Sequence, residues 1–120
     1  MRFLRVSMSA DLISIAELSA SANVSTRVIR HYESIGLLEA IRKGNYRWFD
    51  ANSLEILGDV RLLLRIGFSL QEIGVLMGKD LKETSEFKLG SCVLKRKDLL
   101  ARIFEVKKIS EKMLKKYEKL

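Results

Sequence analysis

The chain has 120 residues, of which 48% are hydrophobic and 31% charged, so it can build one small core and is not a disordered chain. It has no apolar run long enough to cross a membrane, no signal-peptide pattern, and one cysteine, which excludes an intrachain disulfide and fits a reducing compartment. The formal net charge of +7 indicates a polyanionic partner. Most of the excess lies in residues 81–120, with twelve Lys or Arg against six Asp or Glu.

Residues 1–11 have no clear period and are expected to form an N-terminal tail. A short helix is predicted from Ser14, which can cap it together with Glu17 three residues later. A second helix is predicted from the capping residue Ser25 to Gly36, which tolerates the left-handed backbone that ends many helices. Because only a tight turn separates these helices, the pair is typical of a helix-turn-helix motif.

The second helix of this pair has an apolar side and a basic side. Its apolar residues recur at helical spacing from Val28 onward, whereas Arg27, Arg30 and His31 point away from that stripe. A short helix with a basic front is what the major groove of DNA admits. The same pattern also suits an ordinary surface helix with solvated arginines, and this stretch alone does not distinguish the two.

Residues 41–49 (IRKGNYRWF) are predicted to form a β-hairpin, because Gly44-Asn45 lies between residues that favour strands. Arg42, Lys43 and Arg47 surround the turn. They would lie along a phosphate backbone if the hairpin served as a DNA-binding wing. The alternative is a hairpin whose aromatic residues only cover the core, and the cations around the turn favour the wing.

A helix is predicted for residues 51–66, between the N-cap Asp50 and the helix stop Gly67. Apolar residues cover a wide arc of this helix, so we expect much of it to be buried. A further short helix capped by Ser69 follows it. The polar residues 79–87 are interpreted as a linker.

Residues 88–120 are predicted to form one long helix, because apolar residues follow a heptad seam over about four heptads. A lone helix of this length cannot bury such a stripe against itself, so it is interpreted as a coiled-coil dimerisation helix. Packing within its own chain is the alternative. The candidate dimer contacts on the seam are Leu99, Ile103, Val106, Met113 and Tyr117.

Three sequence blocks occur in order along the chain: ISIAELSASANVSTRVIRHYESIGLL, GNYRWFD and IGFSLQEI. Together they resemble the MerR family of bacterial transcription regulators, matching its helix-turn-helix, its wing and its second helix pair. The resemblance covers residues 13–78, and the long C-terminal helix suits the family's dimerisation helix. The chain departs from the usual family pattern at Ala40, at the Gly44-Asn45 order of the turn, and at His31.

The resemblance implies a mechanism. Family members bind as dimers held by an antiparallel coiled coil, and they distort promoter DNA so that RNA polymerase can engage both promoter elements. By position, Arg27 and Arg30 would contact DNA from the recognition helix, Tyr46 and Arg47 would hold the wing on the backbone, and Arg61 would reach a phosphate. The candidate DNA contacts are Ser25, Thr26, Arg27, Arg30, His31, Arg42, Lys43, Tyr46, Arg47 and Arg61.

Cys92 is the candidate sensor residue. Some metal-sensing relatives carry a cysteine near the start of the dimerisation helix, but the further cysteines of those proteins are missing here. One thiolate per subunit makes a poor metal site, because zinc and copper need further ligands. A structural role on the helical seam is therefore favoured over redox sensing, and we expect no metal and no cofactor.

The sequence thus predicts a mostly α-helical protein: a winged helix-turn-helix domain over residues 12–78 with a small β-hairpin, then a linker and a dimerisation helix. We expect a dimeric regulator that binds an inverted repeat in double-stranded promoter DNA, in the bacterial cytoplasm with the nucleoid. The alternatives are an interaction protein whose C-terminal helix docks a partner protein, and a phage-type excisionase or architectural DNA-binding protein. An enzyme is not expected, since no nucleophile–base set or paired-carboxylate pattern is present.

Overall fold

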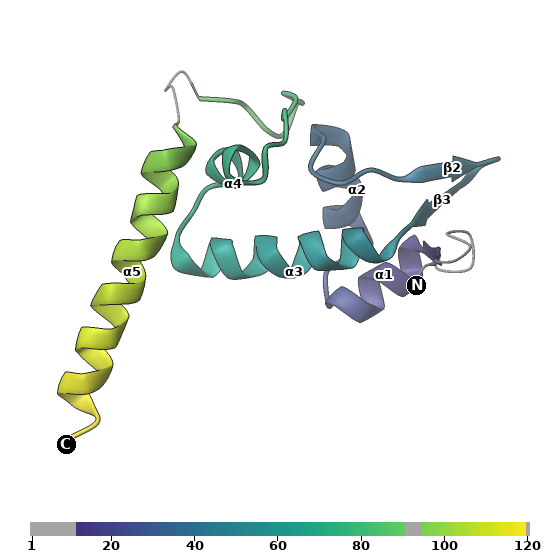
Figure 1. Cartoon of the computed structure of the whole chain (residues 1–120). Helices are drawn as coiled ribbons and strands as arrows, with labels where there is room; N and C mark the ends of the chain where they lie inside the picture. The colour runs from purple at the N-terminus through teal and green to yellow at the C-terminus, as the bar shows by residue number, and fades with distance from the viewer. Residues whose placement is uncertain (1–11, 91–94, 120) are drawn as a thin grey trace, which may run out of the picture.

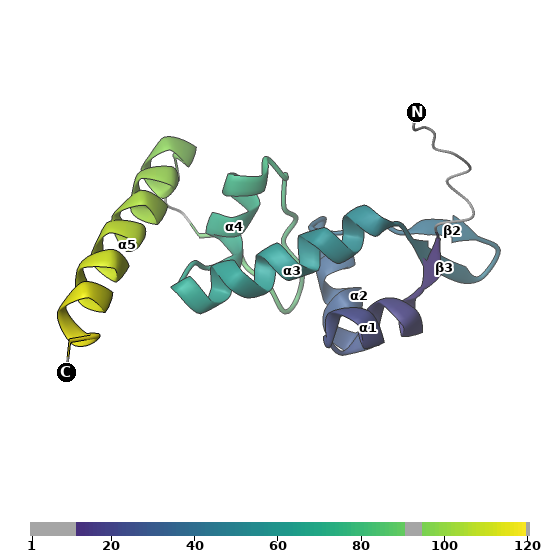
Figure 2. The same ribbon diagram turned by 60° about the horizontal axis from the view of Figure 1, so that its bottom comes forward.

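The computed structural model describes residues 12–90 and 95–119, which form a small helical domain with a hairpin and one long helix (Figure 1). In chain order its elements are β1 (Ile13–Ser14), α1 (Ile15–Ala22), α2 (Thr26–Ile35), β2 (Ile41–Lys43), β3 (Tyr46–Phe49), α3 (Ala51–Ile66), α4 (Leu70–Met77) and α5 (Arg96–Tyr117). Both views place the hairpin of β2 and β3 and the helix α5 at opposite ends of the molecule (Figure 1 and Figure 2). The predicted tail, residues 1–11, lies outside the described residues.

Local capping explains where the helices of the domain start. Ser14 and Glu17 form the predicted capping box on α1: Ser14 Oγ accepts the Glu17 N–H at 3.1 Å, and Glu17 Oε1 accepts the Ser14 N–H at 3.0 Å. Ser69 and Glu72 form the same box on α4, at 3.1 and 2.8 Å. Asp50 caps α3 through its side chain. The predicted starts of these helices are confirmed.

A three-stranded antiparallel sheet with the order β1-β3-β2 closes one end of the domain. Ile13 pairs with Phe49, and Ile41 pairs with Trp48, so the predicted hairpin is confirmed. Gly44 has φ +63° at the first position of the two-residue turn, where such hairpins favour glycine. Strand β1 was not predicted, because a strand of two residues is too short to show an alternating pattern.

A single core joins the sheet to α1, α2, α3 and α4. Its fully buried large side chains are Leu18, Ile29, Ile35, Leu37, Leu38, Phe49, Leu57, Val60 and Ile73. In α3 only one side is buried, and Leu54, Leu62, Leu64 and Ile66 are exposed. The expectation that much of α3 is buried is therefore wrong, because α3 packs on α1 and α4 along one side only.

Residues 79–87 contain no helix or strand, yet they pack against the domain. Leu81 is buried, and a Cβ at Gly74 would lie 2.7 Å from the Leu81 side chain, so glycine allows this segment to approach α4 closely. The Lys82 N–H donates to the Ile35 carbonyl at 2.8 Å. The segment is thus tied to both α2 and α4, and it is not a free linker.

The long helix starts at Arg96, so the prediction of a helix from residue 88 is wrong. Residues 88–90 are not helical, and Gln71 Nε2 donates to the Lys88 carbonyl at 2.6 Å. Gly90 adds a residue that disfavours helix. Within residues 12–90 and 95–119, no helix is both long and apolar enough to span a membrane.

Candidate nucleic-acid interface

The basic side of α2 faces solvent because the apolar side of this helix is held in the core. Ser25 Oγ accepts the Val28 N–H at 3.2 Å and so starts the helix. Tyr32 lies among the buried residues, and burial raises the pKa of its hydroxyl. Arg27 and Arg30 are exposed on the opposite side. The predicted division of this helix into an apolar and a basic side is confirmed.

A surface hollow of about 530 Å³ joins the basic side of α2 to the hairpin. Arg30 lines it from α2, and residues 45–48 line it from the hairpin. Tyr46 is 71% exposed there. Ser14 and Ile15, at the start of α1, also line the hollow and were not predicted as site residues. The structure therefore brings together Arg30 on α2 and Tyr46 on the hairpin, which were predicted as DNA contacts in two separate elements.

Glu33 on α2 holds two arginines of the hairpin. Arg47 Nε donates to Glu33 Oε1 at 2.7 Å, and Arg42 Nη2 donates to Oε2 at 3.4 Å. The side chains of Glu33 and Arg47 are only 16% and 30% exposed, so the shorter contact is partly shielded from water. Arg47 thus positions the hairpin against α2, and its predicted contact with a phosphate stays a prediction. Glu33 was not predicted as a site residue, because helical periodicity does not reveal a partner fourteen residues away.

A second hollow, of about 380 Å³, lies between the basic side of α2 and residues 84–86. Arg27 Nη2 lies 3.8 Å from Glu86 Oε2, but both side chains are mostly exposed, so this pair contributes little stability. His31 packs edge-on against Phe87, with ring centroids 6.3 Å apart. His31 therefore has a packing contact within the chain and is half-buried, whereas Arg27 and Arg30 are exposed on this surface.

The other predicted DNA contacts, Ser25, Thr26, Lys43 and Arg61, do not line the hollow between α2 and the hairpin. The hydroxyl of Ser25 is used as the α2 cap, and Thr26 beside it is half-buried. Lys43 is exposed on β2 near the turn. Arg61 is exposed on α3 and lines neither of the two hollows beside α2. The predicted contact of Arg61 with a phosphate stays a prediction.

The predicted dimer contacts on α5 divide into two groups. Leu99 is 5% exposed, and Ile103 packs against the core of its own chain. The first turns of α5 therefore pack within the chain, which was the alternative to dimerisation. Val106 is half-buried. Met113 and Tyr117 are exposed, Tyr117 at 56%. Only the later turns therefore leave seam residues free for a second chain.

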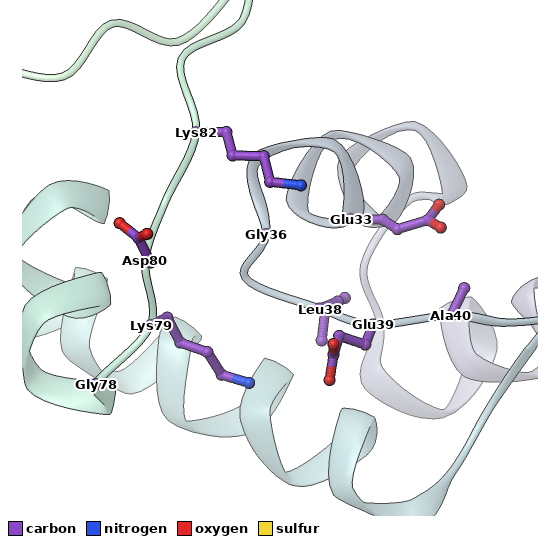
Figure 3. Close-up of a pocket in the computed structure, with 9 residues that line it drawn as sticks. All are labelled: Glu33, Gly36, Leu38, Glu39, Ala40, Gly78, Lys79, Asp80 and Lys82. Carbon is purple, nitrogen blue, oxygen red and sulfur yellow. The ribbon is translucent and has the colours of Figure 1, made fainter.

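A third hollow, of about 510 Å³, lies between residues 33–40 and 78–82 (Figure 3). Lys79 and Lys82 extend from the second segment toward the first, which carries Glu33 and Glu39. With Asp80, three carboxylates and two ammonium groups line the hollow. This mixed charge does not suit a polyanion such as DNA.

No group of three or more His, Cys, Asp and Glu side chains is placed to hold a metal ion in the part of the chain that the structure describes. Cys92, the candidate sensor residue, lies outside the described residues. Its role stays a prediction.

A helix-turn-helix with a β-hairpin beside its second helix, followed by a further helix pair, defines a winged helix-turn-helix protein. The sequence matches the MerR HTH family of regulatory proteins over residues 13–79, more than half of the chain. The chain belongs to this MerR family, a family of regulatory proteins and not of enzymes.

Curated relatives support this membership, and a solved structure shows the same fold. The mercuric resistance operon regulatory protein of Bacillus cereus is 30% identical over 105 residues, which are 83% of this chain and 78% of that protein. Nodulation protein NolA of Bradyrhizobium sp. (strain NC92) is 41% identical over 61 residues, which are 49% of this chain but only 26% of NolA. The structure of HiNmlR, a MerR family regulator lacking the sensor domain, bound to promoter DNA, has the same fold: its TM-score is 0.62 at 22% identity, over 90% of this chain and 82% of that chain.

Proposed function

We propose that the chain is a transcription regulator that binds double-stranded DNA as a homodimer, with α2 in the major groove and the hairpin on the sugar–phosphate backbone. The hollow shared by Arg30 and Tyr46 carries this proposal, because a helix and a hairpin present polar groups to one surface there. Membership of the MerR family supports it. HiNmlR, which has the same fold, was solved bound to promoter DNA.

The charges of this surface suit DNA by their placement. Arg27 and Arg30 are exposed on one helix face, and an arginine fork can bind a guanine edge through two hydrogen bonds. Lys43, exposed near the hairpin turn, is suited to a phosphate contact, which fixes position without reading sequence. Arg47 contributes indirectly, since its bond to Glu33 holds the hairpin beside α2.

The exposed side of α5 supports a dimer. Its exposed large apolar side chains are Leu100, Phe104, Ile109, Met113, Leu114 and Tyr117. An exposed apolar surface of this extent marks an interaction surface, and a second copy of α5 would cover the part of it that carries Met113 and Tyr117. Two copies of α2 related by a two-fold axis would then read an inverted repeat. Distortion of promoter DNA that lets RNA polymerase engage, and a place with the nucleoid in the bacterial cytoplasm, belong to the same proposal.

Selection of binding sites from a random pool of DNA duplexes by the full chain tests this function. We expect an inverted repeat to be enriched, and its affinity to fall steeply with added salt as phosphate-bound counterions are released. Arg30→Ala should weaken binding to the selected duplex by about 1–3 kcal/mol, the usual value of one arginine–base contact. Lys112→Ala, which removes the same charge from an exposed position on α5, is the control and should change affinity little.

Two results would contradict the proposal. One is a selection that yields no inverted repeat, as expected of a protein that uses α5 only to dock a partner protein. The other is an Arg30→Ala chain that binds the selected duplex as tightly as the unchanged chain.

A further inference from the structure

Arg102, in the second turn of α5, joins the long helix to the corner between α3 and α4. Its Nη1 and Nη2 donate to Glu72 Oε2 and Oε1 at 2.8 and 3.1 Å. Its guanidinium also lies over the Phe68 ring, with Cζ 4.0 Å from the ring centroid. Two parallel hydrogen bonds and a stacked ring fix both the position and the direction of a guanidinium. We call Arg102, Glu72 and Phe68 the clasp.

The two domain residues of the clasp, Glu72 and Phe68, are also held in place by contacts that do not involve Arg102. Glu72 Oε1 accepts the Ser69 N–H at 2.8 Å, and the Glu72 N–H donates to Ser69 Oγ at 3.1 Å. Phe68 is 2% exposed and belongs to the core. The hydrogen bond from Arg102 is the main reason that the pKa of Glu72 is lowered, followed by the bond from Ser69. Arg102 therefore attaches α5 to a rigid point of the domain.

The remaining contacts of α5 with the domain set its orientation less strictly. Leu99 is buried and Ile103 packs against the core, but apolar contacts have no preferred direction and allow a helix to roll. Arg96 Nε donates to the Leu76 carbonyl at 3.0 Å, a single hydrogen bond about which the helix can pivot. The clasp adds the second polar attachment, six residues further along α5.

The length of α5 amplifies its angle to the domain. With 22 residues the helix is about 33 Å long, and it reaches well beyond α4 (Figure 1 and Figure 2). A rotation of about 10° at the clasp would move the far end of α5, about 22 Å away along the helix, by roughly 4 Å. That is slightly more than the rise of one base pair, which is about 3.4 Å. Because the proposed dimer contacts Met113 and Tyr117 lie toward this far end, the angle at the clasp determines how far apart the two α2 helices lie.

We propose that Arg102 is a positioning residue that sets the spacing between the two half-sites of the DNA inverted repeat. It acts by fixing the angle between α5 and the domain through Glu72 and Phe68. This inference rests on the proposed function, since it requires a dimer that binds two half-sites.

Parallel selections from one random pool of DNA duplexes test this role. We expect the full chain and Arg102→Met to enrich the same half-site sequence. The full chain should enrich one spacing between half-sites, whereas Arg102→Met should enrich several. Inserting one base pair into the selected repeat should weaken binding of the full chain by at least about tenfold, and binding of Arg102→Met by only about twofold. Lys112→Met, a change at an exposed α5 position, is the control and should keep the single spacing.

Two further variants separate angle from charge and from folding. Arg102→Lys keeps the positive charge but loses the double hydrogen bond and the flat stacking group, so it should broaden the spacing as Arg102→Met does. Glu72→Gln keeps an acceptor oxygen for Ser69 but loses the charge that Arg102 binds, and it should have the same effect. It also provides the test if Arg102→Met does not fold.

The possible outcomes distinguish this inference from the proposed function. A folded, dimeric Arg102→Met chain that enriches the same single spacing as the full chain overturns the inference and leaves the proposed function intact. An equal loss of affinity for every spacing also overturns it, because Arg102 would then support binding without setting the geometry. If the full chain enriches no inverted repeat, both the proposed function and the inference fail.

Discussion

The winged domain buries a core of large apolar side chains, whereas α5 exposes most of its own. In the domain, Phe49 and Ile73 are fully buried by neighbours from the same chain. In α5, Phe104 and Tyr117 are more than half exposed. The difference follows from the number of neighbours: four helices and a sheet surround the domain core, whereas α5 meets the domain only through its first turns. The domain can fold as a unit on its own contacts, while most of α5 needs a second surface.

The largest expected effect is on the domain core. Phe49→Ala should lower the free energy of unfolding by about 3–5 kcal/mol, because it removes a fully buried ring and leaves a cavity. Chemical denaturation followed by circular dichroism measures this loss. Phe104→Ala, the same change at an exposed position of α5, should cost less than about 1 kcal/mol in dilute solution. Equal losses would remove the distinction between the two regions.

The second prediction concerns the exposed side of α5. Met113→Glu combined with Tyr117→Glu should weaken the proposed dimer by about a hundredfold or more, since it would place charges in the apolar interface proposed for α5. The unfolding of the domain should stay unchanged. Sedimentation velocity measures the dimer, with Lys112→Glu combined with Lys119→Glu as a control at exposed polar positions. A dimer that survives the first pair of changes would place the interface elsewhere on the chain.

A smaller effect is expected where α2 holds the hairpin. Glu33→Gln removes the charge that Arg47 and Arg42 bind, and it should lower the stability of the domain by about 1 kcal/mol. Hydrogen exchange should become faster at the amides of β2 and β3, because the hairpin loses its attachment to α2. The exposed Glu39→Gln is the matched control. Unchanged exchange in the hairpin after Glu33→Gln would show that the sheet alone fixes its position.

The smallest effect is the pH dependence of the clasp. The pKa of Glu72 lies below its ordinary value of 4.5, mainly because of the hydrogen bond from Arg102. A carboxyl with a lowered pKa in the folded chain stabilises the fold above its unfolded pKa, and this contribution is lost as the pH falls through the lowered value. The pair is partly exposed, so the contribution should be below about 1 kcal/mol.

Denaturation of the full chain and of Glu72→Gln at several pH values measures the contribution of the Glu72 carboxylate to stability. The difference in stability between them should shrink as the pH is lowered from about 6 to about 3. A difference that stays constant with pH would mean that the carboxylate of Glu72 adds nothing to the attachment of α5.

Local signals in the sequence determined most of the domain. The capping box of Ser14 and Glu17, the glycine stop after α2 and the Gly44-Asn45 turn each act over a few residues, so the chain itself shows where these elements begin and end. The split between the apolar and basic sides of α2 also follows from spacing alone. These short-range features, in their order along the chain, also carried the family resemblance.

The tertiary structure decided which surface covers each side chain. The heptad pattern of α5 predicts an apolar face, but it cannot show that Leu99 faces its own chain while Tyr117 does not. Nor can periodicity reveal the bond from Arg47 to Glu33 or that from Arg102 to Glu72, because these partners are distant in sequence and meet only when the helices pack. A helical pattern records the environment that a side chain prefers, and only the packing of distant segments decides which neighbour provides it.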